Sequence, residues 1–343
     1  MKKDLAINYM RGLVILFVVA NHALYSTVAS ELTYLKDIYS SIFREGTTMF
    51  ILISGYLFYY LKDRFVYKNF MTKKIENVLF PYLIMSVPAI ALYVLGVKVE
   101  HDWIEMDRFH EIPTFLQILY LYVTGAHLGP LWYIPVIMLI FLCTPVILWM
   151  LEKINTLFLV ILSLTLALFV SRPESNSNEL LSFVHFSPIF IFGCILCMKR
   201  DYWLSILVER YYFFVGLLIY VNLIIFEVLP PFADKILLFL LLYAALYIVS
   251  EKNLIVRITE VLNFLAVYSF PIYFIHGYIV SGTKLYLGDY VFRSAIEYSF
   301  YSFFVFVLAV TFSILLTNFS AFLFRDKTNI IVGLNYKEYL QLK

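Results

Sequence analysis

The sequence predicts an all-α protein that crosses a membrane many times, and three observations support this fold class. Hydrophobic residues make up 62% of the 343 residues, and charged residues only 15%. The mean hydropathy is +0.84, which exceeds what a soluble domain needs to bury its core. Apolar stretches of about 20 residues, the length that spans a bilayer as a helix, recur along the whole chain. The net charge of +2 gives no indication of a nucleic-acid partner.

Ten stretches have the length and composition of membrane spans, and we expect them to form one membrane domain over residues 1–343. No segment between them is long enough for a separate soluble domain, and no internal repeat divides the chain. The approximate spans are 9–27, 42–61, 78–97, 131–151, 155–171, 183–198, 211–228, 232–250, 261–281 and 300–324.

The basic residues alternate in phase with these ten spans. If the N-terminus is cytoplasmic, the inner segments carry 18 of the 26 lysines and arginines, and the outer segments carry eight. Fourteen of the 24 acidic residues lie in the outer segments. Cytoplasmic segments of membrane proteins carry an excess of lysine and arginine. We therefore expect both termini in the cytoplasm and a multi-pass protein of the inner, or cytoplasmic, membrane.

The first span contains one arginine and one histidine on the same helix face. Arg11 and His22 are eleven residues apart, which is three turns plus about 20°, with a rise of about 16 Å. Ionisable groups inside a membrane face other protein or water, because hydrocarbon makes them costly. This face therefore predicts a site. The alternative for Arg11 is a topology anchor at the inner surface, and for His22 a hydrogen-bonded core residue.

The ninth span carries a second polar face. Ser269, Tyr273 and His276 are spaced i, i+4 and i+7, so they share one side of the helix. His276 lies about as far into its span as His22 does, and both spans run outward, so we expect the two histidines at the same depth. Tyr273 alternatively belongs to the interfacial aromatic belt.

Two further spans place polar or aromatic residues at the outer side. Glu45 precedes the second span and could orient an imidazole, or it could pair with the neighbouring Arg44. Trp132 opens the fourth span and could stack on a sugar ring, or anchor the helix at the headgroups. Ser54-Gly55, in the middle of the second span, indicates close helix packing rather than a serine nucleophile.

The sequence predicts no metal site. Cys194 and Cys197 have the CxxC spacing, but no second pair or histidine cluster accompanies them, so we interpret them as small apolar fillers of a helix. The outer loop 98–130 contains an apolar stretch, Phe115–Val123, that is too short to cross and should lie along the interface or re-enter. The other histidines lack ligand-like spacing, and we assign them no catalytic role: His101, His110, His127 and His185.

Four of these stretches, taken in order, resemble one known family. They are Asn8 to Leu13 followed by His22, Phe50 to Leu57, Leu131-Trp132-Tyr133, and Ser269 to His276. In these motifs the chain resembles the acyltransferase 3 family of bacterial integral-membrane O-acyltransferases. The resemblance covers most of the chain and implies the stand-alone form, without an extracellular esterase-like domain.

One motif departs from the family pattern. After the second span the family usually has two arginines three residues apart ahead of a Pro-Tyr pair. Here Lys74 and Asn77 occupy those positions before Pro81-Tyr82. Lys74 keeps the first positive charge, but its ammonium is a point charge that cannot make the bidentate contacts of an arginine. Asn77 has no positive charge at the second position. We expect this change to affect either the affinity for a phosphorylated donor or the identity of that donor.

The resemblance implies transfer of an acyl group, commonly acetyl, from cytoplasmic acyl-CoA to a hydroxyl of an extracytoplasmic glycan or an undecaprenyl-linked saccharide. Acyl-CoA is then a co-substrate, and no resident cofactor is expected. His22 would act as general base, or form a transient acyl-histidine, near a carboxylate such as Glu45. The other roles are oxyanion stabilisation or sugar positioning for His276 and Tyr273, donor binding for Arg11, Lys73 and Lys74, and acceptor binding for Trp132 and Ser269.

Two other classes of function fit the same features. A transporter or flippase of a glycan or small solute would also line a path with polar helix faces. A structural subunit of a polysaccharide synthase or export complex would need no histidine chemistry. The sequence does not identify the acceptor sugar, the acyl group or the oligomeric state.

Overall fold

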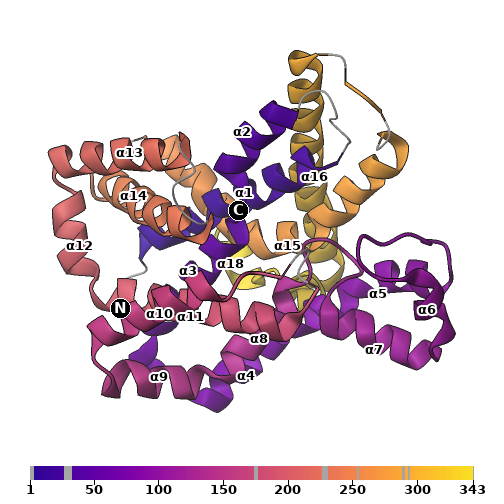
Figure 1. Ribbon diagram of the computed structural model, residues 1–343, viewed down its shortest axis with the longest axis horizontal. Helices are drawn as coiled ribbons and strands as arrows, with labels where there is room; N and C mark the ends of the chain where they lie inside the picture. The colour runs from indigo at the N-terminus through magenta and orange to yellow at the C-terminus, as the bar shows by residue number, and fades with distance from the viewer. Residues whose placement is uncertain are drawn as a thin grey trace.

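The computed structural model describes residues 4–26, 33–173, 177–225, 231–252, 255–287, 290–292 and 294–342, and within these ranges the chain is helical, with no strand. Figure 1 shows α5, α6 and α7 at one edge of the molecule and α12 and α13 at the other, with α1, α3 and α15 between them. The all-α prediction is confirmed. The C-terminal ends of the predicted spans 9–27 and 211–228 lie outside the described residues.

The N-terminal half contains helices at each of its predicted apolar stretches and also between them. They are α1 (Leu5–Leu24), α2 (Thr33–Phe43), α3 (Gly46–Tyr60), α4 (Tyr67–Lys74), the π-helical turn η2 (Ile75–Leu79), α5 (Phe80–Val94), α6 (Met106–Glu111), α7 (Thr114–Thr124), α8 (Tyr133–Leu142), α9 (Thr144–Lys153) and α10 (Thr156–Phe169), with a short 3-10 turn η1 (Lys62–Arg64). The short apolar stretch Phe115–Val123 forms α7, as its composition indicates.

The C-terminal half contains the two longest helices. Its elements are α11 (Glu179–Met198), α12 (Arg200–Leu207), α13 (Arg210–Ile225), α14 (Pro231–Glu251), α15 (Val256–Leu287), α16 (Ala295–Phe324), the 3-10 turn η4 (Arg325–Lys327), α17 (Thr328–Val332) and α18 (Tyr336–Leu340). The last three elements turn back from the end of α16.

Six helical segments of the described chain are long and apolar enough to cross a membrane. The number rises to eight if each of two bent pairs is one span: α8 with α9, which meet at 56°, and α12 with α13. The multi-pass class is therefore confirmed. Each of the ten predicted stretches overlaps a helix, but α3 has 15 residues and α10 has 14. The count of ten and the cytoplasmic termini stay predictions.

The first helix is the centre of the bundle. It packs against α2, α3, α14, α15 and α16, and α3 packs along α11 on the other side. Asp4 caps α1, because its Oδ1 accepts from the Ile7 N–H at 3.2 Å. Its Oδ2 accepts from Tyr56 at 2.9 Å and Tyr243 at 2.6 Å, and Arg200 donates to the Tyr243 hydroxyl. This buried network joins α1 to α3, α12 and α14.

Two glycines allow α3 and α11 to approach closely. A Cβ on Gly55 would overlap the Phe190 carbonyl, and one on Gly193 would overlap the Leu52 carbonyl. The predicted packing role of Ser54-Gly55 is confirmed at the glycine. Small residues let membrane helices bring their backbones together, which increases the van der Waals contact that holds them in lipid.

We predict that Gly55→Ala lowers the free energy of unfolding by about 1–3 kcal/mol, because the methyl group forces α3 away from α11. Thermal unfolding in detergent measures the effect. The matched control is Gly282→Ala in α15, where a Cβ meets nothing within 4 Å. Alanine is the better helix former there, so this variant should be neutral or slightly more stable. Equal destabilisation by both variants would contradict the proposed close contact.

Candidate active site

The site lies along the contact between α1 and α15. A Cβ on Gly12 would overlap the Leu262 carbonyl, so the two backbones nearly touch at this point. Polar pairs occur in the same order along both helices, which shows that the helices run parallel. The pairs are Asn8 with Asn263, Arg11 with Ser269, and His22 with His276. Arg11 and His22 therefore do share one face of the first helix.

The two membrane histidines lie side by side. Their ring centroids are 5.3 Å apart, at an interplanar angle of 49°. His276 is fully buried, whereas His22 is partly exposed. The Nδ1 atom of His276 is 2.8 Å from the Ile272 carbonyl, and its Nε2 is buried without a hydrogen-bond partner. Because a carbonyl only accepts, Nδ1 carries a proton, and in the neutral ring Nε2 is a free acceptor.

A loop from α7 to α8 covers the histidine pair. The hydroxyl of Tyr273 donates a hydrogen bond to the Pro130 carbonyl, and its ring lies 6.1 Å from that of His276. A Cβ placed on Gly129 would lie 4.0 Å from the Cε1 atom of His22. Gly125 enables the turn, since its φ is +67° and a Cβ would come within 2.6–2.8 Å of the following backbone. The loop thus comes to within side-chain contact of His22.

Arg172 is the centre of a compact cluster that includes Glu45, Thr48 and Trp132. Arg172 makes an ion pair with Glu45, and its guanidinium carbon lies 4.9 Å from the Trp132 ring centroid. Thr48 donates to the other Glu45 oxygen at 2.6 Å. The Arg172 charge also acts on the His22 imidazole. A single arginine before a proline carries no pattern, so only the tertiary structure identifies it.

Glu45 is not paired with its neighbour. Both of its carboxylate oxygens are engaged by Arg172 and Thr48, so the Arg44–Glu45 pair that the sequence allowed is wrong. The Arg44 charge acts instead on Asp234 and Lys235 of α14. Glu45 itself has a left-handed backbone, with φ 61° and ψ 22°. Non-glycine residues in this region are strained, and such strain is concentrated at functional sites.

The opposite end of the polar face carries cationic groups. The Arg11 guanidinium donates to the Ala266 carbonyl and the Ser269 hydroxyl, each at 3.3 Å. The Lys74 ammonium lies 4.3 Å from the Phe141 ring centroid, and its charge interacts with that of Arg11. Lys73 is exposed on the next position of α4. Arg11 and Lys74 therefore lie at the same end of the polar face.

Ser269 belongs to this cationic end. It contacts Arg11 rather than Trp132, and seven residues separate it from His276, a rise of about 10 Å along α15. The structure therefore does not bring together the two residues predicted to bind the acceptor.

The stretch that differs from the family pattern, around Lys74 and Asn77, has an unusual backbone conformation. Lys74 ends α4 and is followed by the π-helical turn Ile75–Leu79. Within this turn Asn77 donates to the Lys73 carbonyl at 2.8 Å, and its Oδ1 accepts from Asn329 of α17 at 3.0 Å. Short π-helical turns within helices are frequent at functional sites. Asn77 therefore connects this turn to the segment after α16.

Cys194 lies at the contact between α11 and α3. Cys194 is buried, with its Sγ 3.2 Å from the Gly55 carbonyl. Within the part of the chain that the structure describes, no three histidine, cysteine or acidic side chains are grouped so as to hold a metal ion.

A polar face that joins a histidine pair to a cationic end, inside a bundle with several apolar helices long enough to cross a membrane, is the arrangement of a multi-pass membrane protein with a candidate site between its helices. The chain belongs to the acyltransferase 3 family, because the family model described as an acyltransferase domain matches residues 4–318, nearly the whole chain. The predicted family is confirmed, and with it an acyltransferase of the membrane. No curated protein and no solved structure matches the chain.

We predict that the Glu45–Arg172 pair is energetically coupled. The two side chains are 13% and 31% exposed, so removing one partner leaves a largely desolvated charge. A double-mutant cycle with Glu45→Gln and Arg172→Gln should give a coupling of about 0.5–3 kcal/mol in thermal unfolding. The control pair is Glu105 and Arg108, which are 69% and 81% exposed and should show no measurable coupling. Additive effects of the two substitutions at 45 and 172 would contradict the pairing.

Proposed function

We propose that the protein transfers an acyl group, acetyl in the first instance, from cytoplasmic acyl-CoA to a hydroxyl of an extracytoplasmic glycan or a lipid-linked saccharide. The observation that carries this proposal is the spacing of the site. Arg11 lies about 16 Å along α1 from His22, and the two side chains face the same helix. A donor with anionic phosphates and a reactive group at the end of a long thin arm matches this separation.

The reaction that fits the histidine pair is direct transfer. His22 takes the proton of the acceptor hydroxyl, and the oxygen attacks the thioester carbonyl carbon. The carbon–sulfur bond then breaks, and the coenzyme A thiolate recovers a proton from the His22 imidazolium. A hydroxyl is a weak nucleophile at its free pKa, so a base in contact with it is needed.

In this scheme His276 and Tyr273 are positioning residues: His276 orients the acceptor, and Tyr273 fixes the loop beside the histidines. The free Nε2 of His276 accepts a hydrogen bond from a second hydroxyl of the acceptor, which orients the sugar so that the reacting hydroxyl donates its proton to His22. Tyr273 donates to the Pro130 carbonyl, so it fixes the loop that covers the histidines. Because the Tyr273 hydroxyl hydrogen is already donated to Pro130, we assign Tyr273 this role in place of direct oxyanion stabilisation.

The two ends of the face bind the two substrates. Arg11 and Lys74 provide the cations for the donor's phosphates, and exposed Lys73 adds charge at the entrance. At the other end, the Trp132 ring is buried, with Phe186 stacked on it at 5.3 Å, so we assign it to the acceptor end as the surface that holds Arg172. Glu45 holds Arg172 against that surface and beside His22. The acceptor is placed at this end because the donor end faces the cytoplasm in the proposed orientation.

We predict that His22→Ala and His22→Gln each lower kcat by about 10²–10⁴-fold, because general-base catalysis is lost. Transfer from radiolabelled acetyl-CoA by the purified protein measures the rate, and mass spectrometry of surface glycans measures acylation in cells. His110→Gln is the control, since His110 is exposed on α6, far along the chain from the site. Glycan movement by wild-type protein without consumption of acetyl-CoA would contradict transfer and favour a transporter.

We predict that Arg11→Lys raises the KM for acetyl-CoA about 10- to 100-fold, with a smaller effect on kcat. The variant keeps the charge but loses the forked guanidinium, and charge-assisted hydrogen bonds contribute about 1.5–3 kcal/mol. The control is Arg257→Gln. Arg257 is exposed near the start of α15, the helix that Arg11 contacts, so this variant should leave the KM for acetyl-CoA unchanged. A loss of kcat at unchanged KM would contradict donor binding by Arg11.

A further inference from the structure

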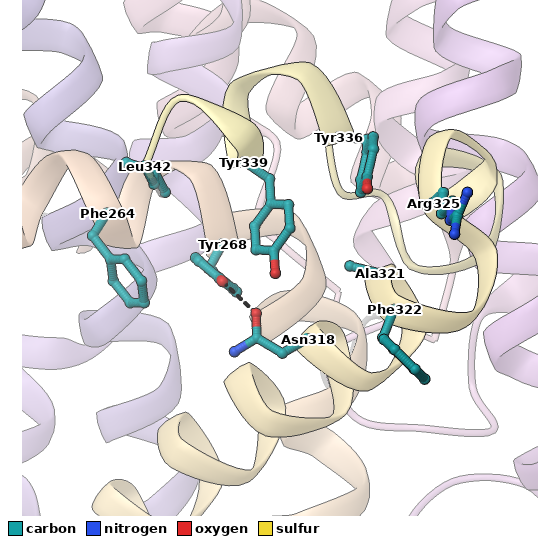
Figure 2. A pocket seen from close by; sticks show the side chains of 9 residues that line it. All are labelled: Phe264, Tyr268, Asn318, Ala321, Phe322, Arg325, Tyr336, Tyr339 and Leu342. Carbon is teal, nitrogen blue, oxygen red and sulfur yellow. Dashed lines mark hydrogen bonds between the residues drawn. The ribbon is translucent and has the colours of Figure 1, made fainter.

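A cavity of about 570 Å³ lies between α15, the end of α16 and the C-terminal helix α18. Its volume falls within the range of about 300–1,000 Å³ typical of small-molecule sites. Figure 2 shows that side chains from all three elements surround it, with Tyr339 above Asn318 and Arg325 at one end. Apart from Phe264, Tyr268 and Asn318, its wall consists of residues beyond the family match, which ends at residue 318.

The lining combines aromatic surfaces with a fixed amide and a cation. The Tyr336 and Tyr339 rings lie 5.8 Å apart at 32°, and Tyr268 lies edge-on to Tyr339. The Tyr268 hydroxyl donates to Asn318 Oδ1 at 2.6 Å, which fixes the amide so that its NH₂ group is turned away from Tyr268. A flat heteroaromatic ring that accepts a hydrogen bond suits this surface.

Arg325 adds a phosphate-binding group at the edge of the cavity. The residue ends α16 with φ 49° and ψ −121°, a disfavoured conformation for an arginine. The chain turns there through η4 and α17 and returns as α18 over the cavity. Local strain of this kind is concentrated at ligand-binding segments. The guanidinium is exposed, so it is accessible to a phosphate in solution.

The cavity is adjacent to the cationic end of the site. Tyr268 immediately precedes Ser269, which contacts Arg11, and the charge of Glu338 on α18 acts on Arg11. Glu338 itself precedes the cavity residue Tyr339. A ligand whose diphosphate rests on Arg11 therefore has its next portion beside this cavity.

We propose that the cavity binds the 3′-phosphoadenosine portion of the acyl donor, with the adenine against Tyr336 and Tyr339 and the 3′-phosphate on Arg325. Asn318 donates its amide hydrogen to a ring nitrogen. This inference rests on the proposed function, because it takes acyl-CoA as the donor. It assigns donor recognition to the C-terminal segment 321–342 as well as to the membrane helices.

The test compares acetyl-CoA with its 3′-dephospho form in the full-length protein in nanodiscs. Wild-type protein should show a KM about tenfold lower for acetyl-CoA. Arg325→Gln should abolish this preference by raising the KM for acetyl-CoA, with the KM for the dephospho form unchanged. Lys327→Gln, at an exposed cation two residues away, is the control and should keep the preference. Binding of adenosine 3′,5′-bisphosphate, measured by calorimetry, should weaken about tenfold in Arg325→Gln but not in Lys327→Gln.

The outcomes separate the two proposals. If the wild type uses acetyl-CoA in a His22-dependent way while Arg325→Gln and Asn318→Ala keep the wild-type preference and nucleotide affinity, the cavity assignment is wrong and the proposed function stands. If wild-type protein consumes neither thioester, the proposed acyl transfer from acyl-CoA is contradicted. If Arg325→Gln changes only the dependence on phosphatidylglycerol against phosphatidylcholine in the nanodisc, the cavity binds a lipid headgroup and our assignment is overturned.

Discussion

The close backbone contact between α1 and α15 is the constraint on which the site depends. Gly12 lets the first helix approach the Leu262 carbonyl, and on both sides of this point the two parallel helices are close enough for their polar residues to meet in order. Polar groups in a membrane need partners from the protein, since lipid provides none. The contact therefore does two things at once: it satisfies Asn8 and Arg11, and it brings His22 to His276.

The hydrogen bonds around the histidines leave one atom free. His276 uses Nδ1 on its own helix, and Tyr273 uses its hydroxyl on the covering loop, whereas His276 Nε2 has no partner in the described chain. A buried unpaired acceptor costs free energy, so its presence needs an explanation. A second hydroxyl of the acceptor, next to the one that reacts at His22, would satisfy it by donating its hydrogen to Nε2. The unpaired atom and the partly exposed His22 therefore indicate the same binding position for the acceptor.

Sequence periodicity predicted the part of the site that lies on single helices. The spacing of Arg11 and His22, and the depth of His276, follow from helix geometry alone, and the structure confirms their shared face and contact. The partner of Glu45 could not be predicted, because Arg172 lies 127 residues away and packs there only through the tertiary fold. Hydropathy also does not detect the break at Cys143, where α8 ends and Thr144-Pro145 begins α9 at an angle of 56°. The two helices together are apolar enough for one span, so a hydropathy window runs across the break.

The substitution at Asn77 and the cavity at the C-terminal end are parts of one argument. Where the family usually has a second arginine, Asn77 instead accepts a hydrogen bond from Asn329, which holds α17 against the π-helical turn. That contact fixes the segment that begins at Arg325 and ends with α18. In our proposal for the donor, this segment supplies a further cation for its phosphates, because Arg325 lines the cavity beside the Arg11 end. On this interpretation Asn77 contributes to donor binding by positioning the C-terminal segment, and the loss of one guanidinium from the helix is offset by another that the fold brings to the same substrate.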